Sequence, residues 1–392
     1  MKKLLFVIHS LSYGGAERSL INLLNELPAN RYQVDVLLFQ NRGGFRQQIP
    51  AWVQLLETPE QLRRLYAPLQ LFSGLSLRKL VGTCCAKLVK RTRKEQRSFR
   101  WKMFYKRAID SLDGHYDVAV AYVGSEIMFY VRDKVSSDRK LVWVHNDYRA
   151  AGYSREDEFP YLADMDAIVS VSDECAEILR HEFPEFRERV HYVQNIISSS
   201  MVRAQAMQFE PMEFGDCTIN ILSVGRLAKQ KGFDMAIQAA VLLRKQGICF
   251  RWFVIGEGEL RSDLERQIRD AGAEEYFVLL GTRSNPYPYI RNCSVFVQPS
   301  RFEGKSVVLD EAKILGKAIV ATAYPTVRDQ IVDGNEGLIV PMSAEGVAEG
   351  VMRLLGDQFL YGRISSYLST HEYGNQHEIE KYMSLFDGES NA

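Results

Sequence analysis

The chain alternates short runs of Val, Ile and Phe with helical patterns of ten or more residues, and it repeats this alternation in two successive blocks. Such alternation is typical of parallel strands joined by crossover helices. With 392 residues, 46% of them hydrophobic, the chain is long enough to bury two or three cores. We therefore predict an α/β fold made of two doubly wound parallel-sheet domains.

The first predicted domain spans residues 1–197. Its expected strands are 3–8, 33–39, 116–121, 140–144, 167–171 and 190–193, and its clearest helices are 16–27 and 174–183. A polar stretch at 198–216, which contains Pro211 and Gly215, is the predicted linker.

The second predicted domain spans residues 217–365. Its expected strands are 219–224, 251–255, 277–280, 294–297 and 318–322, and its expected helices are 233–244, 260–269 and 307–315. Gly316 stands where a left-handed residue would end the last of these helices. Residues 366–392 form a further helical segment whose place in the fold the pattern does not determine.

Ligands of doubly wound sheets bind at the carboxyl ends of the strands, so the loops that follow strands are where we look for chemistry. The first such loop holds Gly14 and Gly15 just before a helix. Glycine lets the backbone approach a ligand closely, and a helix N-terminus offers free N–H groups to an anion. A plain turn explains the same two residues equally well.

The loop after the strand at 219–224 carries Arg226 and Lys231. An arginine binds phosphate oxygens through its planar fork, and a lysine adds a point charge. Because both cations follow a strand of a predicted parallel sheet, we favour a phosphate site over a solvated basic loop.

The loop after the strand at 294–297 carries Glu303, and Glu311 follows eight residues later. We expect Glu303 on the loop, Ser306 as the helix cap and Glu311 in the early turns of the helix. The free amides of Gly304, Lys305, Ser306 and Val307 would then face a phosphate or a sugar. One carboxylate on each side would accept hydrogen bonds from hydroxyl groups.

His145 follows the strand at 140–144. A lone histidine is more often structural than catalytic, but its position at the ligand-binding edge of a sheet makes it a catalytic candidate.

No metal site, disulfide or exported location is expected. Asp164 and Asp166 form a D-x-D pattern, but they precede a predicted strand, whereas metal-binding motifs of this kind follow one. The six cysteines lack C-x-x-C spacing, and the basic start of the chain is followed by no cleavage site. No apolar stretch approaches the ~20 residues that span a bilayer, so we predict a cytoplasmic protein whose membrane association is peripheral.

Basic residues are concentrated in one segment, although the whole chain has no net charge. Residues 78–107 contain twelve basic residues and one acid, a net charge of +11, and the remaining 362 residues carry −11. Apolar and aromatic residues are interleaved with these cations, among them Leu80, Leu88, Trp101 and Tyr105. We favour docking of residues 77–107 on an anionic membrane over binding of nucleic acid. A solvated helix face remains the plain alternative.

Taken together, these motifs resemble the large family-4 retaining glycosyltransferases of the GT-B fold. The resemblance rests on Gly14 to Arg18, Gly225-Arg226-Leu227 with Lys231-Gly232, Gly256-Glu257-Gly258, and the two glutamates eight residues apart. Two departures are Gly304-Lys305-Ser306, where the family commonly has Gly-Phe-Pro, and Gln194-Asn195-Ile196, where it commonly has Pro-Asn-Gly.

The resemblance implies two Rossmann-like domains facing a central cleft, with a nucleoside diphosphate sugar held by the second domain and a saccharide acceptor by the first. It assigns Arg226 and Lys231 to the diphosphate, Glu311 to the ribose and Arg283 to the base. Glu303 and the amides at Gly304, Lys305, Ser306 and Val307 would bind the sugar. Gly15 would contact the donor, and His145 would lie beside the reacting centre.

The resemblance further implies a hexosyltransferase that needs no metal or other cofactor, since cations and helix dipoles stabilise the leaving diphosphate. We expect a UDP-sugar rather than a GDP-sugar, and an acceptor that is a saccharide, often lipid-linked, used in cell-surface polysaccharide synthesis at the inner face of the membrane. Two alternatives stay open: a nucleotide-sugar epimerase or sugar phosphorylase on a similar fold, and a catalytically silent membrane-associated partner of a synthesis complex.

Overall fold

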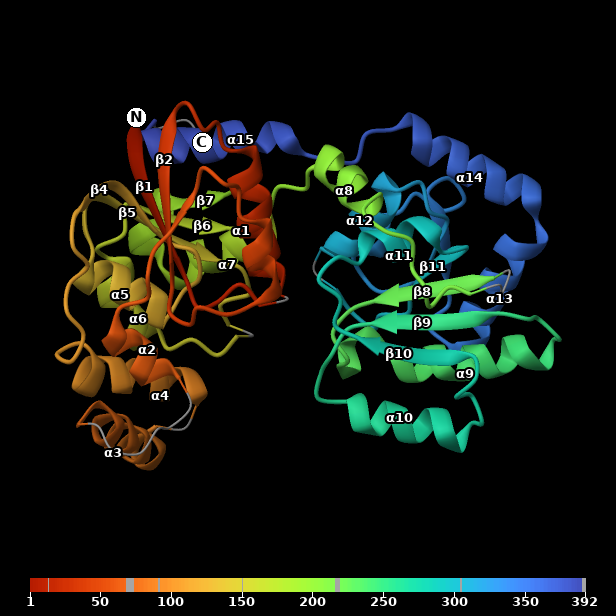
Figure 1. Cartoon of the computed structure of the whole chain (residues 1–392), viewed down its shortest axis with the longest axis horizontal. Coiled ribbons are helices and arrows are strands. Elements are labelled where there is room, and N and C mark those ends of the chain that lie inside the picture. The colour runs from red at the N-terminus through yellow and green to blue at the C-terminus, as the bar shows by residue number, and fades with distance from the viewer. Residues whose placement is uncertain are drawn as a thin grey trace. The chain divides into compact units, whose positions relative to one another are not determined.

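The computed structural model describes residues 1–12, 14–67, 74–90, 92–149, 151–215, 219–303 and 305–389. The chain forms two compact units: unit 1 comprises residues 1–196 and 377–392, and unit 2 comprises residues 197–376. Each unit contains one parallel sheet with helices on both faces (Figure 1). The predicted α/β fold class with two doubly wound domains is confirmed.

Unit 1 has a seven-stranded sheet in the order β3-β2-β1-β4-β5-β6-β7. Its strands are β1 (Lys2–Ile8), β2 (Tyr32–Leu38), β3 (Gln54–Leu55), β4 (His115–Ala121), β5 (Ser136–Val144), β6 (Ala167–Ser170) and β7 (Val190–Tyr192). Every paired strand is parallel to its neighbour. The sequence pattern missed β3, because two residues carry no periodicity.

Helices cover both faces of this sheet because its central strands are apolar on both sides. In β1, Leu4 and Phe6 point into the core under α1, whereas Leu5 and Val7 point into the core under α5. The helical elements are α1 (Gly15–Glu26), η1 (Gly44–Gln48), α2 (Glu60–Tyr66), α3 (Gly74–Val89), α4 (Arg93–Arg100), η2 (Trp101–Tyr105), α5 (Glu126–Lys134), α6 (Arg155–Leu162), α7 (Asp173–Glu182), η3 (Pro184–Arg189) and α15 (Ile379–Asp387).

Unit 2 has a six-stranded parallel sheet in the order β10-β9-β8-β11-β12-β13. Its strands are β8 (Asn220–Val224), β9 (Arg251–Ile255), β10 (Phe277–Gly281), β11 (Val295–Gln298), β12 (Ile319–Thr322) and β13 (Gly337–Val340). The missed strand, β13, is a four-residue run that starts at a glycine. Gly316 has a φ of +66° just after α12, as the sequence predicts.

The helical elements of unit 2 are α8 (Ser199–Ala206), η4 (Lys229–Lys231), α9 (Phe233–Lys245), α10 (Arg261–Asp270), α11 (Tyr287–Asn292), α12 (Val307–Ile314), η5 (Val327–Asp329), α13 (Ala344–Gly356) and α14 (Gln358–Thr370). A short element, η6 (Gln376–Glu378), connects to α15.

The structure divides the chain differently from the predicted boundaries at two places. Residues 198–216, expected as a linker, begin with α8, whose Val202 and Ala206 are buried in the unit 2 core. The expected terminal segment 366–392 is shared between α14 of unit 2 and α15 of unit 1. Tyr382 of α15 stacks on Trp143 of β5, with ring centroids 5.7 Å apart, and its hydroxyl donates to the carbonyl oxygen of Gln194. These tertiary contacts, rather than local periodicity, decide where α15 lies.

Candidate functional site

The predicted donor-site residues of unit 2 come together because β8 and β11 are parallel neighbours. The carboxyl ends of parallel neighbours lie at one edge of a sheet, so the loops that leave them are adjacent. Lys231 comes from the loop after β8, and Glu303 comes from the loop after β11. The sequence placed these two residues in separate motifs, and the sheet order makes them partners.

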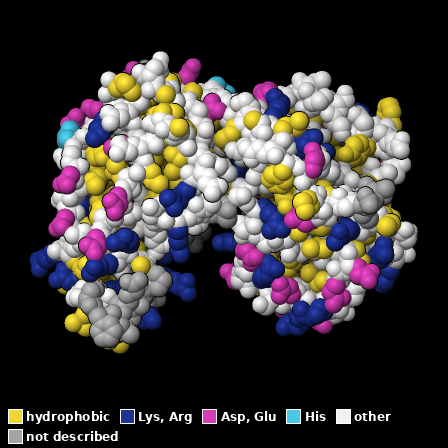
Figure 2. All heavy atoms as spheres, viewed as in Figure 1, with side chains coloured by type: hydrophobic (Ala, Val, Ile, Leu, Met, Phe, Trp, Pro, Cys, Tyr) yellow, Lys and Arg dark blue, Asp and Glu magenta, His cyan; other side chains and the backbone are white. Residues whose placement is uncertain are grey.

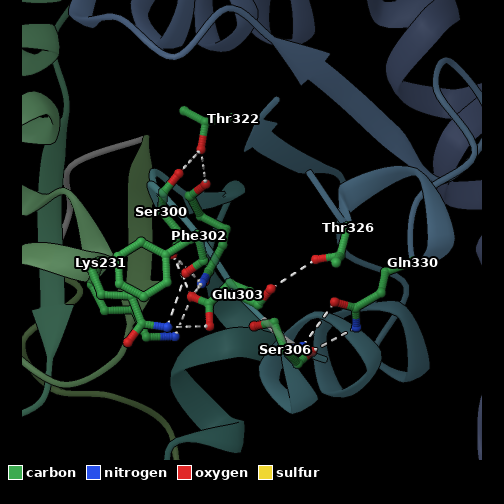
Figure 3. A network of polar contacts seen from close by, with 10 residues as sticks. Lys231, Ser300, Phe302, Glu303, Ser306, Thr322, Thr326 and Gln330 are labelled. Atoms are coloured by element: carbon green, nitrogen blue, oxygen red, sulfur yellow. Dashed lines mark hydrogen bonds and ion pairs between the residues drawn. The ribbon is translucent and has the colours of Figure 1, made fainter. Parts of the chain in front are cut away.

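The Glu303 carboxylate is the centre of a polar network (Figure 3). Its Oε1 accepts hydrogen bonds from Lys231 Nζ at 2.7 Å, from Gln298 Nε2 at 2.9 Å and from the hydroxyl of Ser300. Its Oε2 accepts one from Gln230 Nε2 at 3.2 Å. The side chain is only 7% exposed. These donors hold a buried carboxylate in one orientation, with the Lys231 charge beside it.

Two glycines allow the loops around this network to approach so closely. Gly232 has a φ of +65°, and a Cβ atom there would lie 1.9 Å from the carbonyl oxygen of Pro299. Gly256 has a φ of +151°, and its Cβ would lie 1.9 Å from the carbonyl oxygen of Gly225. Any side chain at either position would force the loops after β8, β9 and β11 apart.

Arg226 lies at the exposed surface of the loop after β8. Within the described parts of the chain, its guanidinium makes no hydrogen bond or ion pair. Its five N–H donors are therefore available to an anion. The ammonium group of Lys231, by contrast, already forms an ion pair with the Glu303 carboxylate.

The start of α12 differs in detail from the expected row of free amides. Ser306 is the N-cap residue, but its side chain makes no capping hydrogen bond. Instead, the Ser306 N–H donates to Gln330 Oε1 at 2.8 Å, and Gln330 Nε2 donates to the Ser306 carbonyl oxygen at 3.1 Å. The Ser306 amide is therefore engaged by the protein. Lys305 Nζ lies 3.9 Å from the Asp310 carboxylate, and Val307 is the first residue of α12. Gly304 lies outside the described residues.

Glu311 lies in the second turn of α12, as expected, and is 5% exposed. Its Oε1 accepts a hydrogen bond at 2.8 Å from the hydroxyl of Tyr287, the first residue of α11. Sequence reasoning missed Tyr287. The available signal was an aromatic residue at a helix start after β10, which is a weak one.

Arg283, predicted to lie against a base, donates to protein acceptors instead. Its Nη2 donates to Glu213 at 2.9 Å, its Nε to the Tyr289 hydroxyl at 3.1 Å, and its Nη1 to the Leu280 carbonyl oxygen at 2.6 Å. These contacts connect the loop after β10 to residue 213 and α11. In this conformation Arg283 therefore stabilises the loop after β10.

Gly15 and His145 lie in unit 1, where Gly15 follows β1, His145 follows β5, and β4 lies between these two strands. Gly15 is the first residue of α1, and a Cβ there would meet no atom within 4 Å, so packing does not demand glycine. His145 Nε2 lies 2.9 Å from the carbonyl oxygen of Tyr122. Because a carbonyl only accepts, Nε2 carries the proton and Nδ1 is left as an acceptor. Burial lowers the pKa of His145 to about 4, so the ring is neutral at pH 7.

The D-x-D pair has protein partners. Asp164 accepts a hydrogen bond from Arg132 Nε at 2.6 Å, and Asp166 accepts one from the Lys140 N–H at 2.7 Å. Among the residues that the structure describes, no group of three or more His, Cys, Asp or Glu side chains could hold a metal ion.

The basic segment 77–107 forms α3, α4 and η2, and its apolar residues separate into two sets. Leu77, Leu80, Val81 and Leu88 are exposed along one stripe of α3, at helical spacing, and Leu88 is 87% exposed. Trp101 and Tyr105, which we expected beside a membrane, are buried in the core of unit 1 instead. Trp101 also donates to Asp133 at 2.9 Å, because a buried indole N–H needs an acceptor. In the described part of the chain, no helix is long and apolar enough to cross a bilayer.

The pKa of His145 predicts a pH dependence for unit 1. An unfolded histidine has a pKa of ~6.5, so between pH 6.5 and pH 4 the unfolded state binds a proton that the folded ring does not. We expect the stability of unit 1 to fall as the pH falls through this window, and His145→Gln to reduce the dependence. The ¹⁵N chemical shifts of the ring should report a neutral Nε2–H tautomer at pH 5.5. A titration midpoint near 6.5 would contradict this prediction.

Comparison with known proteins supports a glycosyltransferase. The model of the family "Glycosyl transferases group 1" matches residues 209–371. Alpha-D-kanosaminyltransferase of Streptomyces kanamyceticus is 30% identical over 51% of this chain and 53% of its own length. N-acetylgalactosamine-N,N'-diacetylbacillosaminyl-diphospho-undecaprenol 4-alpha-N-acetylgalactosaminyltransferase of Campylobacter jejuni is 35% identical over 36% of this chain and 38% of its own length. The amylovoran biosynthesis glycosyltransferase AmsK of Erwinia amylovora is 31% identical over 35% of each chain. The chain thus spans about half the length, or less, of these relatives.

Two solved structures resemble the fold along the whole chain. HepE of Anabaena, in complex with UDP and glucose, has a TM-score of 0.69 at 15% identity and covers 99% of this chain and 100% of its own. A point mutant of S. aureus TarM, in complex with fondaparinux, alpha-GlcNAc-glycerol and UDP, has a TM-score of 0.64 at 14% identity, with the same coverage of both chains. The expected GT-B fold is confirmed, and residues 209–371 are similar to the group 1 glycosyltransferases.

Proposed function

We propose that this protein is a retaining glycosyltransferase that moves a hexose from a nucleoside diphosphate sugar to a saccharide acceptor during synthesis of a cell-surface polysaccharide. The observation that carries the proposal is the placement of exposed Arg226 on the same loop as Lys231, whose ammonium group is paired with Glu303, at the carboxyl edge of the unit 2 sheet. The names of related proteins from amylovoran and capsular polysaccharide biosynthesis support the pathway class.

Arg226 and Lys231 bind the diphosphate of the donor in this proposal. Arg226 has unengaged N–H donors within the described residues, and the Lys231 ammonium group adds a second positive charge beside the same loop. As the sugar leaves, negative charge grows on the diphosphate, and these two cations stabilise it without a metal ion. The UDP bound in the Anabaena and S. aureus structures favours a UDP-sugar as the donor.

The two glutamates bind hydroxyl groups on either side of the diphosphate. Glu311, oriented by the Tyr287 hydroxyl, accepts hydrogen bonds from the ribose. Glu303, fixed by four donors, accepts them from the transferred sugar. An ionised carboxylate accepts hydrogen bonds only, which suits a ligand made of hydroxyl donors.

Retention of configuration follows from attack on the face from which the leaving group departs. The acceptor hydroxyl oxygen forms a bond to the anomeric carbon as the bond from that carbon to the phosphate oxygen breaks. The departing phosphate oxygen takes the hydroxyl proton, and a nucleoside diphosphate is released. In this route neutral His145, with Nδ1 as an acceptor, positions a hydroxyl group of a substrate rather than donating a proton.

Unit 1 docks on the cytoplasmic face of an anionic membrane through α3. Figure 2 shows Lys and Arg side chains gathered beside apolar side chains at the lower end of unit 1, where Figure 1 draws α3 and α4. The exposed stripe of α3 supplies the apolar half of an interfacial helix, and the surrounding cations supply the attraction to anionic lipid. A membrane-bound enzyme would meet a lipid-linked acceptor at the surface where that acceptor lies.

Metal-free nucleotide binding tests the proposed function directly. Calorimetry in EDTA with UDP, GDP and ADP should show tight binding of UDP, and a panel of UDP-sugars with saccharide acceptors should then release UDP. An altered free nucleotide sugar without acceptor would indicate an epimerase, and a requirement for inorganic phosphate would indicate a phosphorylase. Failure to bind any nucleotide would leave the silent-partner alternative.

Arg226→Ala should weaken UDP binding at least tenfold and leave uridine binding unchanged, because charged hydrogen bonds to the diphosphate are lost. The matched control is Arg353→Ala, which removes an exposed arginine from α13 of the same unit. Equal losses of UDP and uridine affinity would refute a diphosphate role for Arg226.

Glu311→Gln should remove most of the preference for UDP over 2′-deoxy-UDP, because an amide is a poorer acceptor than a carboxylate for the ribose hydroxyls. The two dissociation constants, measured by calorimetry, give the ratio directly. Tyr287→Phe, which removes only the orienting hydroxyl, should reduce the preference less. An unchanged ratio in Glu311→Gln would reassign this carboxylate to packing.

Replacement of Leu80 and Leu88 by Glu should abolish co-sedimentation with phosphatidylglycerol vesicles at low salt, because it places charge on the inserted stripe. Phe359→Glu is the control, since Phe359 is 80% exposed on α14. Wild-type protein that fails to co-sediment, or a double variant that sediments like wild type, would exclude docking through α3.

A further inference from the structure

Unit 1 contains a cavity of about 470 Å³ that the donor chemistry does not use. Such a volume falls within the ~300–1,000 Å³ of small-molecule sites. His9 and Ser10 line it just after β1, and Gln40 and Arg42 line it just after β2. The cavity thus opens at the carboxyl edge of the sheet, where doubly wound domains bind ligands.

The cavity is lined by an excess of positive charge. Four cations face it, Arg42, Lys79, Arg97 and Arg100, against the single carboxylate of Glu126. His9 adds no charge at pH 7, because burial and the nearby Arg97 lower its pKa to about 4. Burial also lowers the pKa of Lys79, with Arg100 as a further cause. An anion in the cavity would relieve the repulsion among these four cations.

Two polar atoms of the cavity, Arg100 Nε and Glu126 Oε1, are buried without a hydrogen-bond partner in the described part of the chain. Glu126 is 2% exposed, and its nearest cations, Arg97 and Arg100, lie 3.6 and 3.8 Å away, beyond hydrogen-bond distance. Buried polar atoms are normally paired, so this donor and this acceptor are suited to a ligand that carries both kinds of group.

We propose that this cavity binds the phosphate or diphosphate group of a phosphorylated saccharide acceptor, with Arg42, Arg97 and Arg100 on the phosphate oxygens and Glu126 on a sugar hydroxyl. The identification of the ligand as the acceptor rests on the proposed transferase function. The combination of several cations with one buried carboxylate suits a sugar phosphate better than a bare anion.

The basic segment connects this cavity to the proposed membrane surface. Lys79 belongs to α3, and Arg97 and Arg100 belong to α4. The exposed apolar stripe lies on α3 as well, at Leu77, Leu80 and Leu88, and helical spacing places Lys79 on the other side of that helix. One segment therefore presents apolar residues outward and phosphate-binding cations inward, as an acceptor attached through phosphate to a membrane lipid requires.

The test uses the full chain carrying Arg226→Ala, which weakens the donor site, and inorganic pyrophosphate as the probe in calorimetry. Further replacement of Arg42 or Arg97 by Ala should weaken pyrophosphate binding at least tenfold. Arg93→Ala removes an exposed arginine from α4 outside the cavity and should leave binding unchanged. Arg42 and Arg97 are both exposed, so replacing either side chain by Ala should leave the packing of the hydrophobic core unchanged. Equal affinities in all these variants would overturn the proposal.

Two further arms identify the source of the phosphate. N-acetylglucosamine 1-phosphate should bind with the same dependence on Arg42 and Arg97, and N-acetylglucosamine should not. If the cavity variants lost binding to phosphatidylglycerol vesicles but neither soluble phosphate bound, the cavity would hold a lipid headgroup, and the proposal would be wrong. UDP titration of a chain that carries Arg42→Ala and Arg97→Ala but keeps Arg226 reports on unit 2, so failure of the donor function is separable from failure of this cavity.

Discussion

Parallel pairing of strands that are apolar on both faces is the constraint on which the rest of this structure depends. Because β1, β4, β8 and β11 are buried from both sides, each must be flanked by helices, and each crossover returns the chain to the same end of its sheet. All loops that follow strands are consequently at one edge. Both the Glu303 network and the cationic cavity lie at such edges.

The two candidate sites handle buried charge in opposite ways. In unit 2, the Glu303 carboxylate has four hydrogen-bond donors, so that site is rigid before a ligand binds. In unit 1, the cations around Glu126 outnumber it and lie beyond hydrogen-bond distance. A satisfied carboxylate is suited to orient neutral sugar hydroxyls, whereas unbalanced cations are suited to an incoming anion.

The helical segment between β3 and β4 supplies most of the cations that line the cavity of unit 1. Its aromatic residues Trp101 and Tyr105 pack into the core and anchor the segment, which leaves the cations of α3 and α4 to face the cavity and the solvent. Composition alone could not separate these roles, because a buried tryptophan and a membrane-facing one look alike in a sequence. In the structure, Trp101 is buried in the core, and Asp133 accepts its indole N–H.

Local pattern was sufficient to determine the fold class, most strands and the motif loops, because hydrophobic periodicity and loop composition are properties of neighbouring residues. It also placed Glu303, Gly316 and Glu311 correctly relative to their helix. Pairings between distant residues were decided only by the tertiary structure. The Ser306 N–H donates to Gln330, and Arg283 donates to Glu213. The Tyr287 hydroxyl donates to Glu311, and α15 packs on Trp143. The physical reason is that each of these contacts depends on strand order and helix packing, which bring together residues that no local spacing relates.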